Sequence, residues 1–421
     1  MTIRAVPRAR PDIRSGELLA LLAGIFRSGR AAGPEAVSEF ERAFARYLGA
    51  AGAVAFTSCR AAIYSSLIAL ELRPGDEVIL PAYAYAADAE MVAAAGLKPV
   101  FADVVLGTAN MDPEDAARKI TSRTRVIFPT HMNGIPADLD ALGALARERG
   151  LRLIEDCARA CGLRSGGRMV GTRDIGVFSL GYGKNFDILG GGLAVSSDEA
   201  FLNRLRGLQS GFRPMPRRSL ALRVAKGFVQ KAVNEPHLFR FTLLPVLKAQ
   251  KRDGTRRFAG LVQPTTRPAA LPAGFRTRLS GPQAAQGLRF LARIEAHNLS
   301  RRRNAAALEA ALSGFPGLFH FRSPSGSERL YFNLGSGRRA ELQRLLYCHG
   351  IDAESDSAAD LTRSPAFGTA APGTDYPRAR ELDGKVFYLP NHPALSDGDL
   401  ARIIVLTREF CGREGAERGP G

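Results

Sequence analysis

Phe178-Ser179-Leu180-Gly181-Tyr182-Gly183-Lys184 is the most informative stretch of this 421-residue chain, and Gly190-Gly191-Gly192 follows it closely. The stretch offers a hydroxyl on Ser179 and, five residues later, the amine of Lys184. Upstream, Ile154-Glu155-Asp156 ends a short apolar run with two carboxylates. Apolar runs that end in reactive side chains are typical of strands whose ends carry a chemical site.

Outward from this stretch, short apolar runs alternate with segments of helical periodicity. The expected strands are residues 54–57, 77–81, 99–103, 126–130, 152–156, 177–180 and 192–195. The expected helices include residues 36–48, 61–70, 86–95 and 139–149. This alternation predicts an α/β protein built of βαβ units around a mostly parallel sheet. Ligands of such sheets lie at the carboxyl ends of the strands, where Cys59, Asp156 and Ser179 fall.

The residues at these strand ends fit pyridoxal phosphate (PLP). A lysine amine forms the Schiff base with this cofactor, and an aspartate pairs with the ring nitrogen, which keeps the ring an electron sink. The hydroxyl of Ser179 can bond the cofactor phosphate. A lone lysine in a glycine-rich stretch is usually only solvated, so the combination of Lys184 with Asp156 and Ser179 carries the prediction.

Several blocks, in their order and spacing, resemble the DegT/DnrJ/StrS-type sugar aminotransferases, which are PLP enzymes with the aspartate aminotransferase fold. The blocks include residues 58–62, 74–79, 98–101, 155–156, 178–184 and 278–285, and the resemblance covers residues 28–408. It implies fold type I of the PLP-dependent transferases, in which a large domain with a mostly parallel seven-stranded sheet is followed by a smaller C-terminal α/β domain.

The resemblance also implies the roles of individual residues. Lys184 would be the Schiff-base lysine and general base, and Asp156 would pair with the ring nitrogen. The implied cofactor-binding residues are Ser58, Cys59, Arg60, Tyr85, Asp156, Arg159, Ser179, Lys184 and Arg276. Backbone amides at a helix N-terminus would hold the phosphate, and Tyr85 would stack on the ring. No metal site is expected, because Cys157 and Cys161 do not match a zinc spacing.

Four residues depart from the family pattern. Arg60 stands where the family has a threonine, Arg159 replaces a glutamine, Gly190 replaces a glutamate and Arg276 replaces an asparagine that reaches the partner subunit's cofactor phosphate. Guanidinium groups match phosphate geometry, so we expect Arg60 and Arg276 to tighten PLP binding. The electronics around Arg159 and the amino-donor contacts near Gly190 stay open.

The chain divides into four predicted parts. They are an N-terminal segment (1–34), a large PLP-binding domain (35–281), a small C-terminal domain (282–412) and a disordered tail (413–421). The large domain contains a basic insert of about residues 204–276, with an amphipathic piece at 220–233, an apolar piece at 238–247 broken by Pro245, and a loop at 264–272. A solvated excursion, contact with a substrate or partner subunit, and docking to an anionic membrane all fit the insert.

The composition bounds the setting of the protein. A net charge of +17 favours anionic partners, and five cysteines without a paired framework favour a reduced compartment. No signal peptide and no apolar run of membrane-spanning length is evident. No nucleic-acid-binding motif is recognised, so nucleic acid is not an expected partner. We therefore expect a cytoplasmic protein, with peripheral contact to the inner face of the membrane as an option for the insert. The family resemblance implies a homodimer with active sites at the interface.

The expected activity is an aminotransferase reaction. The amino group would come from an L-amino acid, glutamate or glutamine, and would pass to a keto sugar carried on a nucleotide, in cell-surface polysaccharide or secondary-metabolite biosynthesis. Three alternatives stay open. They are a PLP enzyme acting on a cyclitol or another keto substrate, a PLP-dependent sugar dehydratase, against which Lys184 argues, and a non-catalytic regulatory or membrane-associated protein of the same fold.

Overall fold

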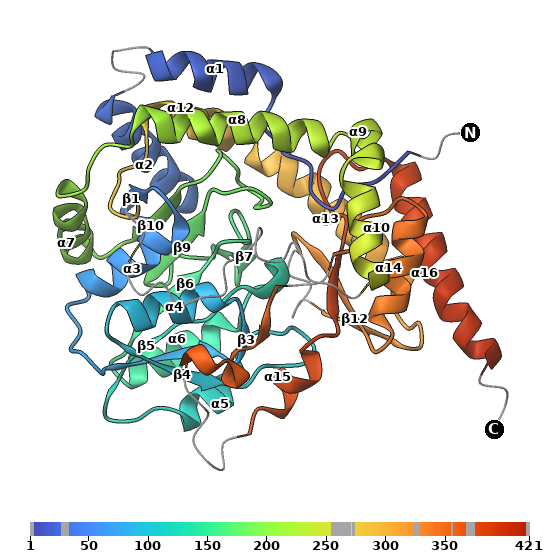
Figure 1. Ribbon diagram of the computed structural model, residues 1–421. Coiled ribbons are helices and arrows are strands. Elements are labelled where there is room, and N and C mark those ends of the chain that lie inside the picture. Colours follow the sequence, from blue (N-terminus) through green and yellow to red (C-terminus); the bar gives the residue numbers. More distant parts are fainter. Residues whose placement is uncertain are drawn as a thin grey trace.

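The computed structural model describes residues 4–26, 33–253, 271, 274–322, 329–354, 357–367 and 375–417. A large α/β domain and a smaller domain lie side by side (Figure 1). The loop expected at residues 264–272 lies outside the described residues, apart from Leu271.

The large domain is built on the seven-stranded sheet that the sequence predicts. In spatial order its strands are β1 (Gly52–Phe56), β10 (Gly192–Ser196), β9 (Ile175–Ser179), β6 (Arg152–Asp156), β5 (Thr124–Ile127), β2 (Glu77–Pro81) and β4 (Lys98–Ala102). Only β10 runs against its neighbours, and the pairs from β9 to β4 are parallel. The α/β class and the mostly parallel sheet are therefore confirmed.

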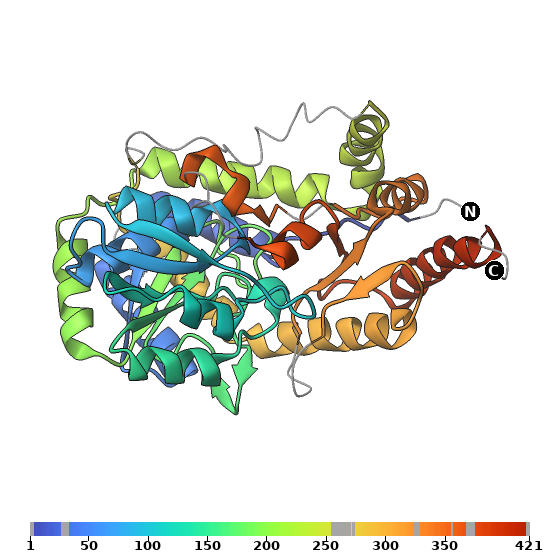
Figure 2. The same cartoon turned by 90° about the horizontal axis from the view of Figure 1, so that it is seen from below.

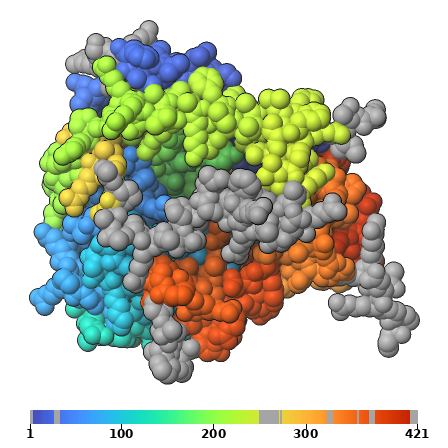
Figure 3. All heavy atoms as spheres, viewed as in Figure 1, coloured from blue at the N-terminus to red at the C-terminus, as the bar shows by residue number. Residues whose placement is uncertain are grey.

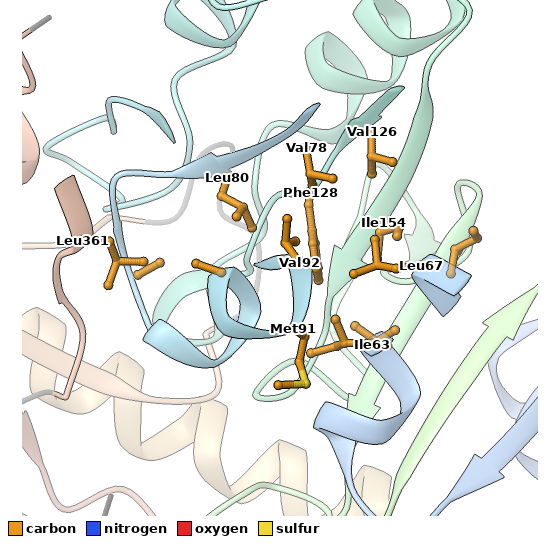
Figure 4. Close-up of a cluster of buried hydrophobic side chains, with 14 of the residues drawn as sticks. Ile63, Leu67, Val78, Leu80, Met91, Val92, Val126, Phe128, Ile154 and Leu361 are labelled. Atoms are coloured by element: carbon orange, nitrogen blue, oxygen red, sulfur yellow. The ribbon is translucent and has the colours of Figure 1, made fainter. Parts of the chain in front are cut away.

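Helices cover both faces of this sheet. One face carries α3 (Cys59–Ala69), α4 (Ala86–Ala94) and α7 (Glu199–Ser210); the other carries α2 (Pro34–Leu48), α5 (Pro113–Arg118), α6 (Leu139–Glu148) and α12 (Gly281–Leu291). Val78 and Leu80 pack toward α3 and α4 (Figure 4), whereas Ile79 between them faces the other core. The alternation follows from the two-residue period of a strand.

The small domain is a three-stranded antiparallel sheet backed by helices. Its elements are β11 (Leu318–His320), β12 (Phe332–Ser336), β14 (Val386–Leu389), α13 (Ile294–Leu312), α14 (Arg339–Cys348) and α16 (Asp397–Glu417). Helix α15 (Pro377–Leu382) precedes β14, but it buries Ala379 and Leu382 in the core of the large domain. The helical pattern from residue 282 to 312 is two helices, and α12 packs on α2 of the large domain. Helix α16 continues to Glu417, past the start of the tail that the sequence predicts to be disordered.

Short elements complete the described chain. They are β3 (Tyr83–Ala84), which pairs with β13 (Ala359–Asp360), the hairpin of β7 (Arg164–Ser165) and β8 (Arg168–Met169), and the 3-10 turns Met132–Gly134, Leu361–Arg363 and Pro365–Phe367. The β3–β13 pair joins a segment of the small domain to the chain just before Tyr85.

The N-terminal segment and the basic insert pack on both domains. Helix α1 (Ser15–Phe26) packs on α8 (Arg217–Val233), while α9 (Pro236–Phe241) leads to α10 (Leu243–Asp253), which packs on α14. Figure 2 shows α8 and α10 along one side of the molecule, spanning from the large to the small domain. Before α1, Val6 pairs with Ile351 of the small domain. The insert is therefore not a purely solvated excursion.

The break in the apolar part of the insert differs from the expectation. Helix α9 ends at Phe241 with Thr242 as its C-cap, and Pro245 is the third residue of α10. Proline is tolerated there, because N–H groups of a first helical turn have no intrahelical partner.

Candidate active site

The reactive side chains gather at one edge of the large sheet. Strand β6 ends at Asp156, β9 ends at Ser179, and the chain passes from β1 through Thr57 and Ser58 into α3. These three strands run in the same direction, so their carboxyl ends meet at this edge. Lys184 lies in the loop that follows β9.

The start of α3 forms a cradle for an anion. The Ser58 hydroxyl caps the helix by accepting the Ala61 N–H at 3.2 Å, and the first N–H groups of a helix are free to bind phosphate. A Cβ on Gly192 would lie only 2.5 Å from the Cys59 nitrogen, so glycine permits the close approach of the two backbones. Ser179 pairs with Gly192 across β9 and β10, so Ser179 is the strand neighbour of the glycine that approaches this cradle.

The Lys184 amine lies beside an aromatic ring and a second cation. Its Nζ is 5.7 Å from the centre of the Tyr85 ring. Burial, followed by the charge of Arg159, lowers the pKa of Lys184 to about 8, although the charge of Asp156 opposes this shift. An amine with this pKa gains and loses a proton near neutral pH, which suits a lysine that must act as a nucleophile and as a base.

The carboxylate of Asp156 is held in a fixed position. The residue is only 5% exposed, and its Oδ1 accepts the Ala158 N–H at 2.8 Å. Its backbone N–H donates to the Pro129 carbonyl at 2.9 Å, and its carbonyl accepts the His131 N–H at 3.1 Å. Because these bonds already fix the Asp156 carboxylate, it would lose little further conformational freedom on pairing with a ring nitrogen.

Three tyrosine rings surround the guanidinium of Arg159. The Arg159 Cζ lies 5.2 Å from the centre of the Tyr85 ring, 5.1 Å from that of Tyr331 and 4.6 Å from that of Tyr388. The hydroxyls of Tyr85 and Tyr388 are hydrogen-bonded to each other. Tyr331 and Tyr388 belong to the small domain, so the site is closed by both domains. The sequence did not single out these two residues, although Tyr388 directly precedes Leu389-Pro390, a further pair that resembles the family.

A buried cluster behind the site is fully engaged in hydrogen bonds. His131 Nε2 lies 3.1 Å from Glu155 Oε2, while its Nδ1 accepts the Ala137 N–H. Glu155 also accepts the N–H groups of Gly171 and Arg173, at 2.7 and 3.0 Å. Cys157 lies close enough to complete a metal-ligand set with His131 and Glu155. However, the atoms of His131 and Glu155 that could bind a metal already take part in these hydrogen bonds. The bonds connect the segments at this edge of the sheet.

Two of the predicted phosphate ligands lie at the rim. The side chains of Arg60 and Arg276 are exposed, and neither guanidinium donates a hydrogen bond within the described part of the chain. The Arg276 carbonyl accepts the Arg213 N–H at 3.1 Å. The roles of Arg60 and Arg276 stay predictions.

Arg223, an arginine of the basic insert, contacts the chain next to the cradle. Arg223 of α8 donates to the Thr57 carbonyl at 3.2 and 3.3 Å, to the Thr57 hydroxyl at 3.0 Å and to the Leu189 carbonyl at 3.4 Å. A Cβ on Gly190 would lie 2.5 Å from Arg223 Nη1, and Gly190 has a φ of +105°. The departure from glutamate at this position therefore makes room for Arg223, a residue that the sequence did not identify.

The described residues fit PLP, with an amine at Lys184, a fixed carboxylate at Asp156 and an anion cradle at the start of α3. This fold and this site define an α/β enzyme of the aminotransferase class. The chain belongs to the DegT/DnrJ/EryC1/StrS aminotransferase family, whose sequence profile matches residues 13–407. The family predicted from the sequence is thereby confirmed.

Individual relatives agree over nearly the whole chain. The dTDP-3-amino-3,4,6-trideoxy-alpha-D-glucose transaminase of Streptomyces venezuelae is 31% identical over 400 residues, which are 94% of this chain and 92% of that protein. The structure of S. venezuelae DesV in complex with a ketimine intermediate matches with a TM-score of 0.75 and 29% identity, and covers 96% of this chain and 99% of DesV. The structure of 3-amino-5-hydroxybenzoic acid synthase matches with a TM-score of 0.74 and 25% identity, over 96% and 98% of the two chains.

Proposed function

We propose that this protein is a PLP-dependent aminotransferase that moves an amino group from an L-amino acid, glutamate or glutamine, to a keto sugar carried on a nucleotide. The observation that supports it most is the placement of Lys184, Asp156 and the α3 cradle at one edge of the sheet. The 31% identical transaminase, whose name specifies a dTDP-linked amino sugar, supports the acceptor class.

Different residues would perform different parts of this reaction. The first-turn N–H groups of α3 and the hydroxyls of Ser58 and Ser179 would hold the phosphate, and Asp156 would pair with the ring nitrogen. When bound, the cofactor supplies an electron sink that stabilises negative charge on the substrate carbon. Lys184 would hold the cofactor through its Nζ, and the same Nζ would accept and donate protons during the reaction, for which its pKa of about 8 is suited. Tyr85 and the tyrosines around Arg159 keep water from this space.

One second candidate has a specific observation in its favour. The synthase of 3-amino-5-hydroxybenzoic acid is as similar in fold as the sugar enzymes, so amination of a cyclitol or another non-sugar ketone is the alternative acceptor chemistry. Lys184 argues against the dehydratase alternative, and the joint presence of Lys184 and Asp156 argues against a non-catalytic protein.

The first test is the visible absorption spectrum of the protein with PLP, recorded before and after addition of glutamate, for wild type, Lys184→Ala and the exposed-lysine control Lys226→Ala. We expect a band of the lysine-bound cofactor in wild type and in the control, which glutamate bleaches, and no such band in Lys184→Ala. A wild type without the band would refute the proposal. Nucleotide-linked keto sugars and keto cyclitols, supplied to the amino-loaded enzyme, then decide between the two acceptor classes.

The setting of the enzyme is also a proposal: a cytoplasmic homodimer in which the insert contributes to the interface. Among the described residues, no helix is long and apolar enough to cross a membrane. The insert exposes Leu222, Val229 and Phe241 by 71%, 60% and 75%, and Figure 3 shows α8 to α10 as a continuous band across one face. Exposed apolar side chains mark an interface when they gather into one patch, and these three residues are what supports the proposal.

Sedimentation of wild type and of the double variant Leu222→Asp/Phe241→Asp tests this assignment. We expect a dimer for wild type and weakened association for the variant. A monomeric wild type that co-sediments with anionic vesicles, and loses that binding in the variant, would instead assign the face to the membrane.

A further inference from the structure

A second carboxyl group lies against Asp156, and nothing in the sequence reading pointed to it. Asp88 is the third residue of α4 and is only 3% exposed. Its Oδ2 accepts a hydrogen bond from the Thr130 hydroxyl at 3.4 Å. Thr130 follows β5 and forms a bridge with Asp156, so Asp88 is held at the same sheet edge as the proposed partner of the ring nitrogen.

Through Thr130 the carboxyl groups of Asp88 and Asp156 are brought against each other, and Asp156 acts on Asp88 both through its charge and as a hydrogen-bond partner. Two carboxylates can share a hydrogen bond only if one of them carries a proton, and two adjacent buried negative charges would repel each other strongly. Burial, followed by the charge of Asp156 and the hydrogen bond to it, raises the pKa of Asp88 well above its ordinary value. The charge of Lys184 and the bond from Thr130 oppose this rise without cancelling it.

The other groups around the pair favour the same assignment. The charged and titratable groups that act on Asp88 are Asp156 from β6 and Lys184 from the loop after β9. Cys59 of α3 is close enough to feel the charges of both acids. Burial, followed by the charges of Asp156 and Asp88, raises the pKa of its thiol. The cation that acts on Asp88, Lys184, has its own pKa lowered to about 8, so it does not neutralise two carboxylates over the whole neutral range.

We infer that Asp88 is a positioning residue that shares one proton with Asp156 and holds the Asp156 carboxylate oriented toward the cofactor nitrogen. The inference rests on the proposed function, because it takes Asp156 as the partner of that nitrogen. A carboxylate accepts about four hydrogen bonds. Asp156 therefore has capacity for a ring nitrogen in addition to the Ala158 N–H and the proton on Asp88.

Cofactor-free protein tests the shared proton. Asp88→Asn keeps the shape and offers an N–H donor that does not titrate. Because the folded state raises the pKa of Asp88, the stability that this group contributes is full below about pH 4 and is lost as the pH rises through the raised pKa. The unfolding midpoint of wild type should therefore fall between pH 5 and pH 9 more steeply than that of Asp88→Asn. Glu39→Gln, which changes an exposed acid on α2, should follow wild type.

PLP titration tests the positioning role. Asp88→Ala lacks the donor to a charged group, so its PLP dissociation constant at pH 7 should rise on the order of tenfold. Asp88→Asn should restore binding close to that of wild type. Equal pH slopes for wild type and Asp88→Asn, or PLP binding by Asp88→Ala as tight as in wild type, would overturn the inference. A wild type that binds no PLP would count against the proposed function, while the slopes of the cofactor-free protein still decide whether the pair shares a proton.

Discussion

Arg223 of α8 donates hydrogen bonds to both the carbonyl and the hydroxyl of Thr57, the residue that precedes the Ser58 cap of α3. No acid forms an ion pair with Arg223 in the part of the chain that the structure describes, and burial lowers the pKa of its guanidinium. A cation that gives its hydrogen bonds to neutral groups beside an anion cradle makes that cradle more favourable for phosphate. The basic insert thus contacts the chain directly beside the α3 cradle.

Replacement of Arg223 tests this connection. Arg223→Ala removes bonds that fix Thr57 and also a positive charge, so PLP affinity should fall about fivefold or more. Lys226→Ala, an exposed change on the same helix, should leave affinity unchanged. Fluorescence titration with PLP measures both, and equal affinities for the two variants would show that Arg223 only braces the helix.

Replacement of Arg159 by the family's glutamine should change the proton affinity of Lys184. The Arg159 charge contributes to the lowered pKa of about 8, so Arg159→Gln should raise that pKa and leave less neutral amine at pH 7.5. The rate at which cofactor-free protein captures PLP, followed from pH 6 to 10, should shift its midpoint upward. Arg164→Gln, on the exposed β7 strand, is the control; an unshifted midpoint in Arg159→Gln would contradict the prediction.

A methyl group on Gly192 should disrupt the anion cradle. The new Cβ would meet backbone atoms, 2.5 Å from the Cys59 nitrogen and 2.6 Å from the Ser58 carbonyl carbon, which cannot move aside as a flexible side chain would. Gly192→Ala should destabilise the protein by about 1–3 kcal/mol and weaken PLP binding. Gly207→Ala in α7, where the methyl group meets nothing within 4 Å, should be neutral or stabilising. Urea unfolding measures the free energy of unfolding of both variants, and a Gly192→Ala variant as stable as Gly207→Ala would contradict the prediction.

The N-terminal segment should contribute stability that acid removes. Burial opposes ionisation of Glu17, but hydrogen bonds from Arg293 and the Arg14 N–H lower its pKa to about 2. The contribution is therefore present above the unfolded-state pKa of about 4.3 and is lost as the pH falls toward 2. Glu17→Gln should destabilise the protein at pH 6 and make little difference near pH 2. Denaturant midpoints at both pH values, with exposed Glu35→Gln for comparison, test this sign.

The sequence predicted the sheet because each strand is a short apolar run with turn residues at its ends. Strands β2 and β6 have the predicted bounds. Lys184, Asp156 and Ser179 could be identified because their residue types stand at strand ends in a recognisable order. The break between α12 and α13 could not be predicted, because Leu288, Leu291 and Ile294 keep a helical spacing of apolar residues across it.

The residues that the sequence missed share one physical reason. Asp88, Arg223, Tyr331 and Tyr388 reach the site from segments distant in the chain, and none stands in a local pattern that differs from ordinary helix or strand. An aspartate in a first helical turn is usually read as a partner of the helix dipole. Only tertiary packing shows that Asp88 is buried against Asp156.

The pairing of Val6 with Ile351 has a consequence for how the chain reaches its native state. Val6 donates to the Gly350 carbonyl at 2.8 Å and accepts the Asp352 N–H at 2.9 Å. During synthesis the first residues leave the ribosome long before their partners exist, and contacts so distant in sequence form slowly. The beginning of the protein must therefore wait, unpaired, until the small domain is made. A nascent chain arrested before residue 351 would present that segment to chaperones and proteases.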